Sequence, residues 1–485
     1  MPTCTGNCAS IKPAAGNGFI FRGGDTWGSS NFGINWTWAG NATNPIYIGV
    51  DKNWFSGSSW ARPIWNLQML PNFNGPVFNG SVPYWIADNI EITGVFFCSA
   101  CGTSGTGAYV FQACTNHATV ENSYYHGWGW TTPWTRAGGP FDAGFIQIGC
   151  GVSSYAGDTA RYNVVDGSDT ANPQVALVTF AGNIPIAYGN YMNYVWSGLD
   201  GCGDDWYNNV VNNMGIPVNA FYNSGGSYHQ NAFKHLGPCS NSVIFFYNNV
   251  VSNQINWGGG GGAVKYWING IPGSYTTYAF NNVVTNVVPG NVIDDADQSH
   301  CTNCSSGTYY FFNNTIQCGN NSSMGACSLG MTTGGTINAY LSDNHWIQSG
   351  TGSPLSCTNN PGGTCTETND VLQTLAQANA QGYTDASSYA FQPTSTSGST
   401  VTAAANAAAR QSLCTTIGAV DAGVGTACQS DTTYACSYDT TSHTVRCPTR
   451  ETVARTAEPN IGAYQFSSAQ ASIPNPPAGL TVSVQ

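Results

Sequence analysis

The chain has 485 residues and a mass of 51.1 kDa, with 12 Lys and Arg against 24 Asp and Glu, so its formal net charge is −12. Only 7% of the residues are charged, whereas an ordinary soluble domain has roughly 25%. Aromatic residues make up 13%, which excludes intrinsic disorder, because disordered chains are poor in aromatics and rich in charge. The scarcity of Lys and Arg excludes a nucleic-acid-binding protein, since binding phosphates needs clustered cations.

The sequence predicts a secreted protein. No stretch approaches 18 consecutive apolar residues, and residues 1–17 lack a basic segment followed by an apolar one, so we expect neither a membrane span nor an intact signal peptide. Eighteen Cys indicate an oxidising compartment, although the two Cys-x-x-Cys pairs leave a zinc site open. The closest spacings predict local disulfides, namely Cys4–Cys8, Cys98–Cys101, Cys301–Cys304, Cys318–Cys327, Cys357–Cys365 and Cys436–Cys447.

In chain order, three short strands are predicted first, at 18–27, 34–38 and 44–51. A repeat follows, in which a short strand, an Asn pair and a second short strand recur with variable loops between the copies. The Asn pairs begin at residues 208, 248, 281 and 313, in steps of 40, 33 and 32 residues. A fixed strand module with variable spacers is the pattern of a solenoid. Degenerate relatives lie at 118–124, 160–165 and 341–347.

The repeating modules favour strands over helices, because they are short, rich in Val, Phe, Tyr, Thr and Ile, and bounded by Gly and Asn. Each module is interpreted as two strands joined by an Asn turn. Asn tolerates the left-handed backbone of a sharp bend, and stacked Asn side chains can hydrogen-bond as an interior ladder. Stacked coils of this kind form a parallel β-helix.

The character of the sequence changes near residue 355. Residues 371–380 and 403–413 are helical candidates among paired Cys and Ser/Thr-rich loops. We therefore expect the β-helix with its opening coils at 1–354, a disulfide-stapled C-terminal cap on the solenoid end at 355–466, and a Pro/Ser-rich linker tail at 467–485.

The whole pattern resembles the secreted bacterial right-handed parallel β-helix proteins of the pectate-lyase-like superfamily. The resemblance depends on Arg22-Gly-Gly-Asp25, the Tyr-Asn-Asn-Val modules, Tyr228-His-Gln-Asn-Ala232 and the motif at 459–466. It implies a right-handed, all-β solenoid. It does not fix the activity, because that superfamily contains polysaccharide lyases, glycoside hydrolases and proteins of unknown role.

The first candidate site lies around the acidic segment at 200–205. The resemblance to polygalacturonase-type hydrolases implies Asp204 and Asp205 as the carboxylate pair, His229 as their partner and Lys265 as the cation, with Lys234 nearby. The family's earlier Asp and the Arg two residues before the Lys are missing here. The alternative is a Gly- and Cys-bounded turn with solvated carboxylates.

The second candidate site is acidic, and Asp294, Asp295 and Asp297 suit a hard cation such as Ca²⁺. In the lyase branch Ca²⁺ bridges a uronate to the protein, and Lys234 or Lys265 would then be the base. A polar loop capped by a disulfide is the alternative.

Aromatic residues suggest a glycan groove, because flat rings stack on sugars, although aromatics also fill β-helix interiors. The candidate substrate-binding residues are Trp128, Trp130, Trp134, Trp257 and Trp267.

These observations predict a secreted, monomeric carbohydrate-active enzyme that cleaves glycosidic bonds of an extracellular polysaccharide, as a glycoside hydrolase or a polysaccharide lyase. The rival prediction is a noncatalytic glycan-binding or structural extracellular β-helix protein. Polysaccharide is the expected partner in either case.

Overall fold

The computed structural model describes most of the solenoid and the segment that follows it. The described residues are 13–70, 76–97, 109–130, 144–148, 156–169, 180–181, 185–195, 198–201, 203–214, 232–235, 242–254, 266–268, 275–287, 290–295, 307–320, 323–324, 327–332, 337–349, 354–359, 363–403, 406–455 and 459–467.

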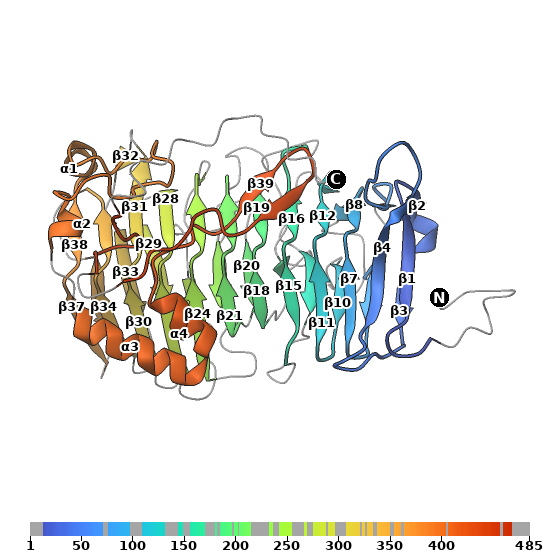
Figure 1. Ribbon diagram of the computed structural model, residues 1–485, viewed down its shortest axis with the longest axis horizontal. Coiled ribbons are helices and arrows are strands. Elements are labelled where there is room, and N and C mark those ends of the chain that lie inside the picture. Colours follow the sequence, from blue (N-terminus) through green and yellow to red (C-terminus); the bar gives the residue numbers. More distant parts are fainter. Residues whose placement is uncertain are drawn as a thin grey trace, which may run out of the picture.

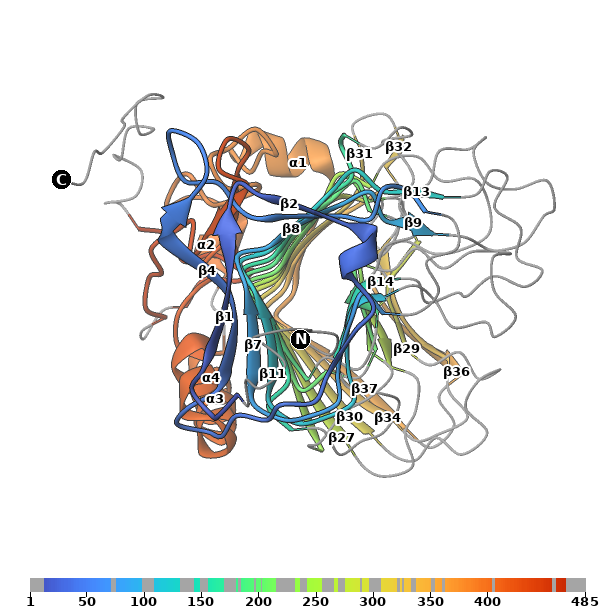
Figure 2. The ribbon, with the colours of Figure 1, turned by 90° about the vertical axis from the view of Figure 1, so that its right-hand side faces the viewer.

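The chain folds as a parallel β-helix, in which successive coils place one strand in each of three walls (Figures 1 and 2). The first wall is a twelve-stranded parallel sheet. Its strands are β1 (Gly18–Gly23), β4 (Ile46–Phe55), β7 (Trp85–Asp88), β11 (Ala118–Glu121), β15 (Thr159–Arg161), β18 (Ile186–Tyr188), β21 (Asp205–Tyr207), β24 (Val243–Tyr247), β27 (Tyr275–Phe280), β30 (Gly307–Phe312), β34 (Ile337–Ser342) and β37 (Thr364–Thr368).

The second wall is a thirteen-stranded sheet that follows the first around a sharp bend. Its strands are β2 (Thr26–Gly28), β5 (Ile64–Asn66), β8 (Glu91–Thr93), β12 (Tyr124–Tyr125), β16 (Val164–Asp166), β19 (Tyr191–Asn193), β22 (Val210–Asn212), β25 (Val250–Ser252), β28 (Val283–Val287), β31 (Thr315–Asn320), β35 (His345–Ile347) and β38 (Val371–Gln373), with β32 (Ser323–Met324) antiparallel to β31.

The third wall consists of a four-stranded sheet followed by a seven-stranded sheet. The first contains β3 (Ile34–Trp36), β6 (Phe78–Gly80), β10 (Tyr109–Ala113) and β14 (Gly144–Ile148), and the second contains β17 (Phe180–Ala181), β20 (Leu199–Gly201), β23 (Phe233–His235), β26 (Tyr266–Ile268), β29 (Gly290–Asp295), β33 (Cys327–Thr332) and β36 (Leu355–Asn359). A short pair, β9 (Phe96–Phe97) and β13 (Gly129–Trp130), lies beside it.

The core fills the inside of the solenoid, because each strand directs alternate residues inward. In β21, for example, Trp206 is fully buried between the partly exposed Asp205 and Tyr207. Large aromatic side chains dominate this interior, among them Trp65, Trp85 and Trp346.

The two residues of each Asn pair have different roles at the bend between the first two walls. The first Asn adopts the left-handed backbone, with φ of 55° at Asn208 and Asn248. The second Asn is buried, and its side-chain amide donates to the Oδ1 of the equivalent Asn in the next coil, at 3.1 Å from Asn209 to Asn249. This interior ladder confirms the predicted one, and it runs through Asn163, Asn190, Asn209, Asn249, Asn282, Asn314 and Asn344 to Asp370.

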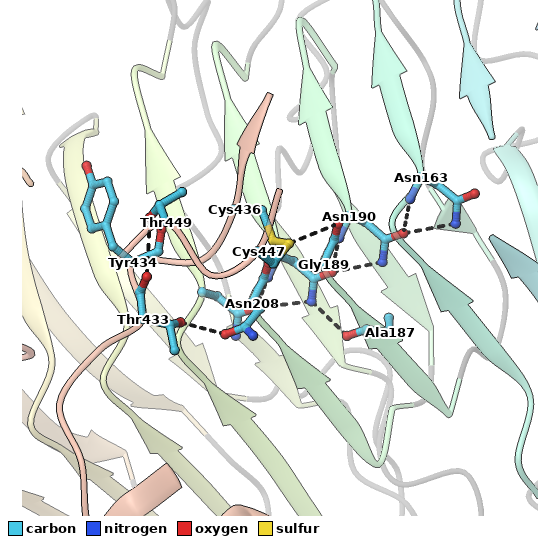
Figure 3. Close-up of a disulfide and its surroundings, with 12 residues drawn as sticks. Asn163, Ala187, Gly189, Asn190, Asn208, Thr433, Tyr434, Cys436, Cys447 and Thr449 are labelled. Carbon is cyan, nitrogen blue, oxygen red and sulfur yellow. Dashed lines mark hydrogen bonds between the residues drawn. A yellow bond between two sulfur atoms is a disulfide. The ribbon is translucent and has the colours of Figure 1, made fainter. Parts of the chain in front are cut away.

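The segment after β38 turns back along the side of the solenoid (Figure 1). It begins with α1 (Leu375–Ala380) and α2 (Ser399–Thr402), and α3 (Ala407–Val420) and α4 (Ala422–Cys428) then cover aromatic side chains on the outer face of the twelve-stranded sheet. We call residues 429–466 the C-terminal strap. It includes the hairpin of β39 (Ser437–Asp439) and β40 (Thr444–Arg446) and lies over the outside of the Asn bend (Figure 3).

The strap is held by buried arginines and by the first Asn of several pairs. Arg62, from the second coil, donates to the carbonyls of Ser442 and His443, at 2.8 and 3.1 Å. The Thr433 hydroxyl donates to Asn208 Oδ1 at 2.7 Å (Figure 3). In two other pairs, the Asn281 amide donates to the Ser430 carbonyl and the Asn313 amide donates to the Asn460 carbonyl. The first Asn thus faces the strap, while the second builds the ladder.

As predicted, the C-terminal segment is stapled by disulfides and packs on the solenoid, but its start and the face it covers differ from the cap that we expected at 355–466. The sheets continue through β36, β37 and β38, so the solenoid extends past residue 354 to residue 373. Beyond it, α1 and the residues after it pack on the outer side of Ile347, and the strap follows the bend rather than closing the end. Both helical candidates contain helix, since α1 lies within 371–380 and α3 begins within 403–413. Their bounds differ from the prediction, because residues 371–373 form a strand and α3 ends only at Val420.

The disulfide prediction is confirmed at Cys436–Cys447, which closes the strap hairpin (Figure 3). Cys318, which we expected to pair with Cys327, and Cys365, which we expected to pair with Cys357, are each disulfide-bonded, as is Cys114. Our nearest-neighbour reasoning missed Cys414–Cys428, which joins α3 to α4. Among the described residues, no helix has the length and apolar character needed to cross a membrane.

Candidate functional site

Strand register in the seven-stranded sheet brings several predicted site residues together. Asp200 on β20 pairs with Lys234 on β23, and Lys234 pairs with Trp267 on β26. One position further along, Ile268 pairs with Asp295 on β29, so Asp294 lies beside Trp267. The neighbouring backbones in such a ladder are roughly 4.8 Å apart. We call Asp200, Lys234, Trp267 and Asp294 the third-wall row.

The structure describes only the backbone of the four residues in the third-wall row, so the row is placed by strand register alone. Leu199 and Phe233, each one residue before a member of the third-wall row, pair with each other and are both fully buried in the solenoid core. Because successive positions of a strand belong to opposite faces of the sheet, the next row belongs to the outer face. An acid, a base, an aromatic residue and a second acid therefore succeed one another on four adjacent coils.

The remaining predictions for this region fall outside the described residues. His229, Lys265, Trp134, Trp257 and Asp297 are in segments that the structure does not describe. Trp130 lies on β13, where only its backbone is described.

Asp204 and Asp205 lie apart from the third-wall row, at the start of β21 in the twelve-stranded sheet. Both backbone N–H groups donate to the Pro185 carbonyl, at 2.8 and 2.9 Å. The Oδ1 of Asp205 is buried and accepts no hydrogen bond. Burial, together with the charges of Asp421 at the start of α4 and of Asp204, raises the pKa of Asp205 to about 8.

Trp128 is fully buried in the solenoid interior, where it packs edge-on against Phe145 with ring centroids 5.3 Å apart. A ring without exposed surface offers no face to a sugar. Its position thus matches the core alternative, and the sugar-stacking role does not fit it.

Two of the three acidic candidates for Ca²⁺ lie in the described part of the chain. Asp294 and Asp295 both belong to β29. Oxygen ligands of this kind are those that Ca²⁺ takes. Within the side chains that the structure describes, no group of three or more His, Cys, Asp or Glu is arranged to hold a metal ion.

Sequence reasoning missed a polar cluster on the outer face of the twelve-stranded sheet. Glu121 pairs in register with Arg161, and their side chains form an ion pair. Arg161 also donates to the Tyr188 hydroxyl at 2.9 Å, and Tyr188 stacks on Tyr207 with centroids 4.7 Å apart. Burial raises the pKa of Glu121 despite this partner. No motif marks the cluster, because its members come from different coils.

A second missed cluster lies on the thirteen-stranded side of the molecule. His126 contacts Asp169 through Nδ1 at 2.6 Å and Glu91 through Nε2 at 3.1 Å. Burial alone would lower the pKa of His126, but the two carboxylates outweigh it and raise the pKa to about 9. The ring is stacked on Tyr124, which also stacks on His443 of the strap.

Comparison with known proteins gives a likeness of fold. No protein-family description and no curated protein matches the chain. Among solved structures, the pectate lyase Pel9A is 14% identical with a TM-score of 0.34, covering 73% of each chain. A PL6 family polysaccharide lyase from Pseudopedobacter saltans is 12% identical with a TM-score of 0.35, covering 76% of this chain and 83% of its own.

The PL6 family alginate lyase AlyGC is also similar, at 12% identity and a TM-score of 0.34, covering 74% of this chain and 49% of its own. At such identities the likeness concerns the fold, so the site is argued from this chain's own residues.

Proposed function

We propose that the protein is a secreted carbohydrate-active enzyme that cleaves glycosidic bonds of an extracellular polysaccharide, and that its site is the third-wall row. The observation that supports this is the register that aligns Asp200, Lys234 and Trp267 on adjacent coils. A base, a ring and acids along one outward row match what recognition and cleavage of a sugar chain need.

The row favours a lyase acting on a uronate-containing polysaccharide. In that reaction the proton on the carbon α to the uronate carboxyl passes to the amine of Lys234. A carbon–carbon double bond forms, the bond to the leaving glycosidic oxygen breaks, and that oxygen takes up a proton. Ca²⁺, bound by Asp294, would neutralise the uronate carboxylate.

The test compares wild type with Lys234→Met on a panel of polyuronates and neutral polysaccharides, with Ca²⁺ or with a chelator. Both reducing ends and the ultraviolet absorbance of unsaturated uronate are measured. We expect the wild type to produce both signals, and Lys234→Met to lower kcat by roughly 10³-fold, the range for removing a proton-transfer group. Lys52→Met, which alters a lysine over Trp60 near the N-terminal end, is the matched control.

An active Lys234→Met variant would remove the third-wall row from the proposal. Failure of the wild type to cleave any member of the panel would favour the rival function, a glycan-binding or structural extracellular protein.

A second candidate, a glycoside hydrolase, is favoured by one observation. The raised pKa of Asp205, about 8, keeps its carboxyl protonated at neutral pH, as a general acid requires. New reducing ends without ultraviolet absorbance, lost in Asp205→Asn, would support it.

Stability separates the two roles of Asp205. A carboxyl with a raised folded pKa contributes stability below the unfolded value of about 3.9, and this contribution is lost as the pH rises to about 8. Asp205→Asn is therefore expected to gain stability relative to wild type between pH 4 and pH 8. If the variant keeps full activity, Asp205 has only this structural effect.

A further inference from the structure

Both ends of the solenoid terminate in strands that have one neighbour. In the described part of the chain, β1 and β2 end the two long sheets on the N-terminal side, and β37 and β38 end them on the C-terminal side. An edge strand presents backbone N–H and C=O groups to any strand that can reach them. All pairs along these two sheets, apart from β31 with β32, are parallel, so the strand direction is the same at both ends.

Among the described residues, which begin at residue 13, part of the apolar interior lies next to the N-terminal end. A cavity of about 270 Å³ opens there, and among its lining residues are Phe21, Trp27, Phe32 and Trp65. The indole N–H groups of Trp27 and Trp65 have no hydrogen-bond partner. The terminal coils of a solenoid need a polar surface to stay soluble. A cavity lined by aromatic side chains does not provide such a surface and is typical of a binding surface.

The C-terminal end is left accessible by the way the chain turns back. The helix α1 follows β38 directly but packs with Tyr383 on the outer side of Ile347. The helices α3 and α4 and the strap lie along the side walls (Figures 1 and 2). Most of β37 is exposed, and Leu372 of β38 only partly covers the core.

From this geometry we propose that copies of this chain associate head to tail, with β37 and β38 of one copy adding to β1 and β2 of the next. Both ends belong to the same two parallel sheets, so the edge strands of one copy have the same direction and spacing as the edge strands that they would meet in the next copy. The contact joins two different surfaces, and it therefore extends into filaments rather than closing as a dimer. It replaces the monomer that the sequence suggested, and it is independent of the proposed cleavage site.

A substitution in β1 can test this proposal, because the structure shows which residues of β1 direct their backbone N–H and C=O groups toward β4 and which direct them away from it. The Tyr47 N–H donates to the Asn17 carbonyl at 3.0 Å, which places Asn17, Phe19 and Phe21 on the β4 side. Bonds in a parallel strand alternate between its two neighbours, so the backbone of Ile20 faces the open edge. Proline at residue 20 therefore blocks that edge without removing a bond to β4.

The experiment measures the mass of the purified full chain by sedimentation velocity over a hundredfold range of concentration, with negative-stain microscopy at the highest one. The wild type is expected to form rods that lengthen along the solenoid axis. Ile20→Pro should weaken association by roughly tenfold or more, and Ile20→Val, the matched control, should not change it.

Ile20→Lys provides a second edge variant in case the proline perturbs folding, because a charged side chain on an edge strand also opposes pairing. Circular dichroism verifies that each variant is folded. A monomeric wild type at all concentrations, or rods that persist in both folded edge variants, would overturn the proposal.

Discussion

The bend and the third wall of the solenoid differ in how they are built. At the bend, the same residue type recurs in coil after coil, with a buried amide ladder inside and the strap outside. Along the seven-stranded sheet, adjacent coils contribute an acid, a base, an aromatic residue and another acid in one row. Repetition at the bend leaves the third wall free to vary, so the bend can supply stability while the third wall carries the recognition that we propose.

The largest expected loss of stability comes from a substitution in the buried Asn ladder. The Asn249 side chain accepts from the Asn209 backbone and amide and donates to the Trp206 carbonyl and to Asn282. Asn249→Ala leaves these buried groups unpaired and should lower the free energy of unfolding by about 4 kcal/mol.

The matched control for the ladder is the neighbouring Asn248→Gly. Asn248 has φ of 55° and an Oδ1 without a hydrogen bond, so glycine fits its backbone and the change should be below about 1 kcal/mol. Urea denaturation measures both variants. Equal losses would mean that the two Asn residues of a pair do not have separate roles.

The second-largest expected loss of stability comes from a substitution in the C-terminal strap. Asp431 is fully buried, pairs with Arg450 at 2.6 Å and accepts from the Gln465 N–H at 2.7 Å. Asp431→Ala removes the carboxylate partner of the buried Arg450 guanidinium and should destabilise the strap by about 3 kcal/mol. Because the strap lies outside the ladder, limited proteolysis should cut the strap first while the solenoid stays intact.

Asp439→Asn is the control for this prediction. Its charged partner Arg446 is largely exposed at 3.7 Å, and Asn keeps the oxygen that accepts from the Thr441 and Ser442 N–H groups, so the effect should be near zero. If Asp431→Ala unfolds the whole chain in one step, the strap and the solenoid are a single cooperative unit.

The smallest expected loss of stability comes from substituting His126, and it depends on pH. The raised pKa of His126 means that its stabilising contribution is complete below the unfolded value of about 6.5 and is lost as the pH rises through about 9. The wild type should be more stable than His126→Gln by about 1 kcal/mol at pH 6, a modest value because Asp169 is half exposed.

The difference between wild type and His126→Gln should disappear by pH 10, as followed by urea denaturation at each pH. A difference that stays constant from pH 6 to pH 10 would mean that His126 contributes through packing rather than charge.

The repeated part of the fold could be predicted from the sequence because it is local. The Asn pairs from residues 208 to 314 specify both the left-handed turn and the ladder within one short motif. Where the motif is degenerate the signal weakens, since Gly189 takes the turn before Asn190 and Tyr162 takes it before Asn163.

The return path of the strap could not be predicted, because its contacts join distant residues. Arg62 and Ser442 are 380 residues apart and share no pattern. The disulfide Cys414–Cys428 was missed for a related reason, since it depends on how α3 packs on α4 rather than on close spacing. Of the predicted site, the register supports a grouping of Lys234, Trp267 and Asp294, whereas it separates them from Asp204 and Asp205.

The most direct test of the account is to locate the bound glycan. Hydrogen–deuterium exchange of the Lys234→Met variant, with and without the polysaccharide that the wild type cleaves, maps the contact onto the walls. The account predicts protection of β20, β23 and β26, with the Asn bend unchanged. Protection confined to the outer face of the twelve-stranded sheet, around Arg161 and Tyr188, would contradict it.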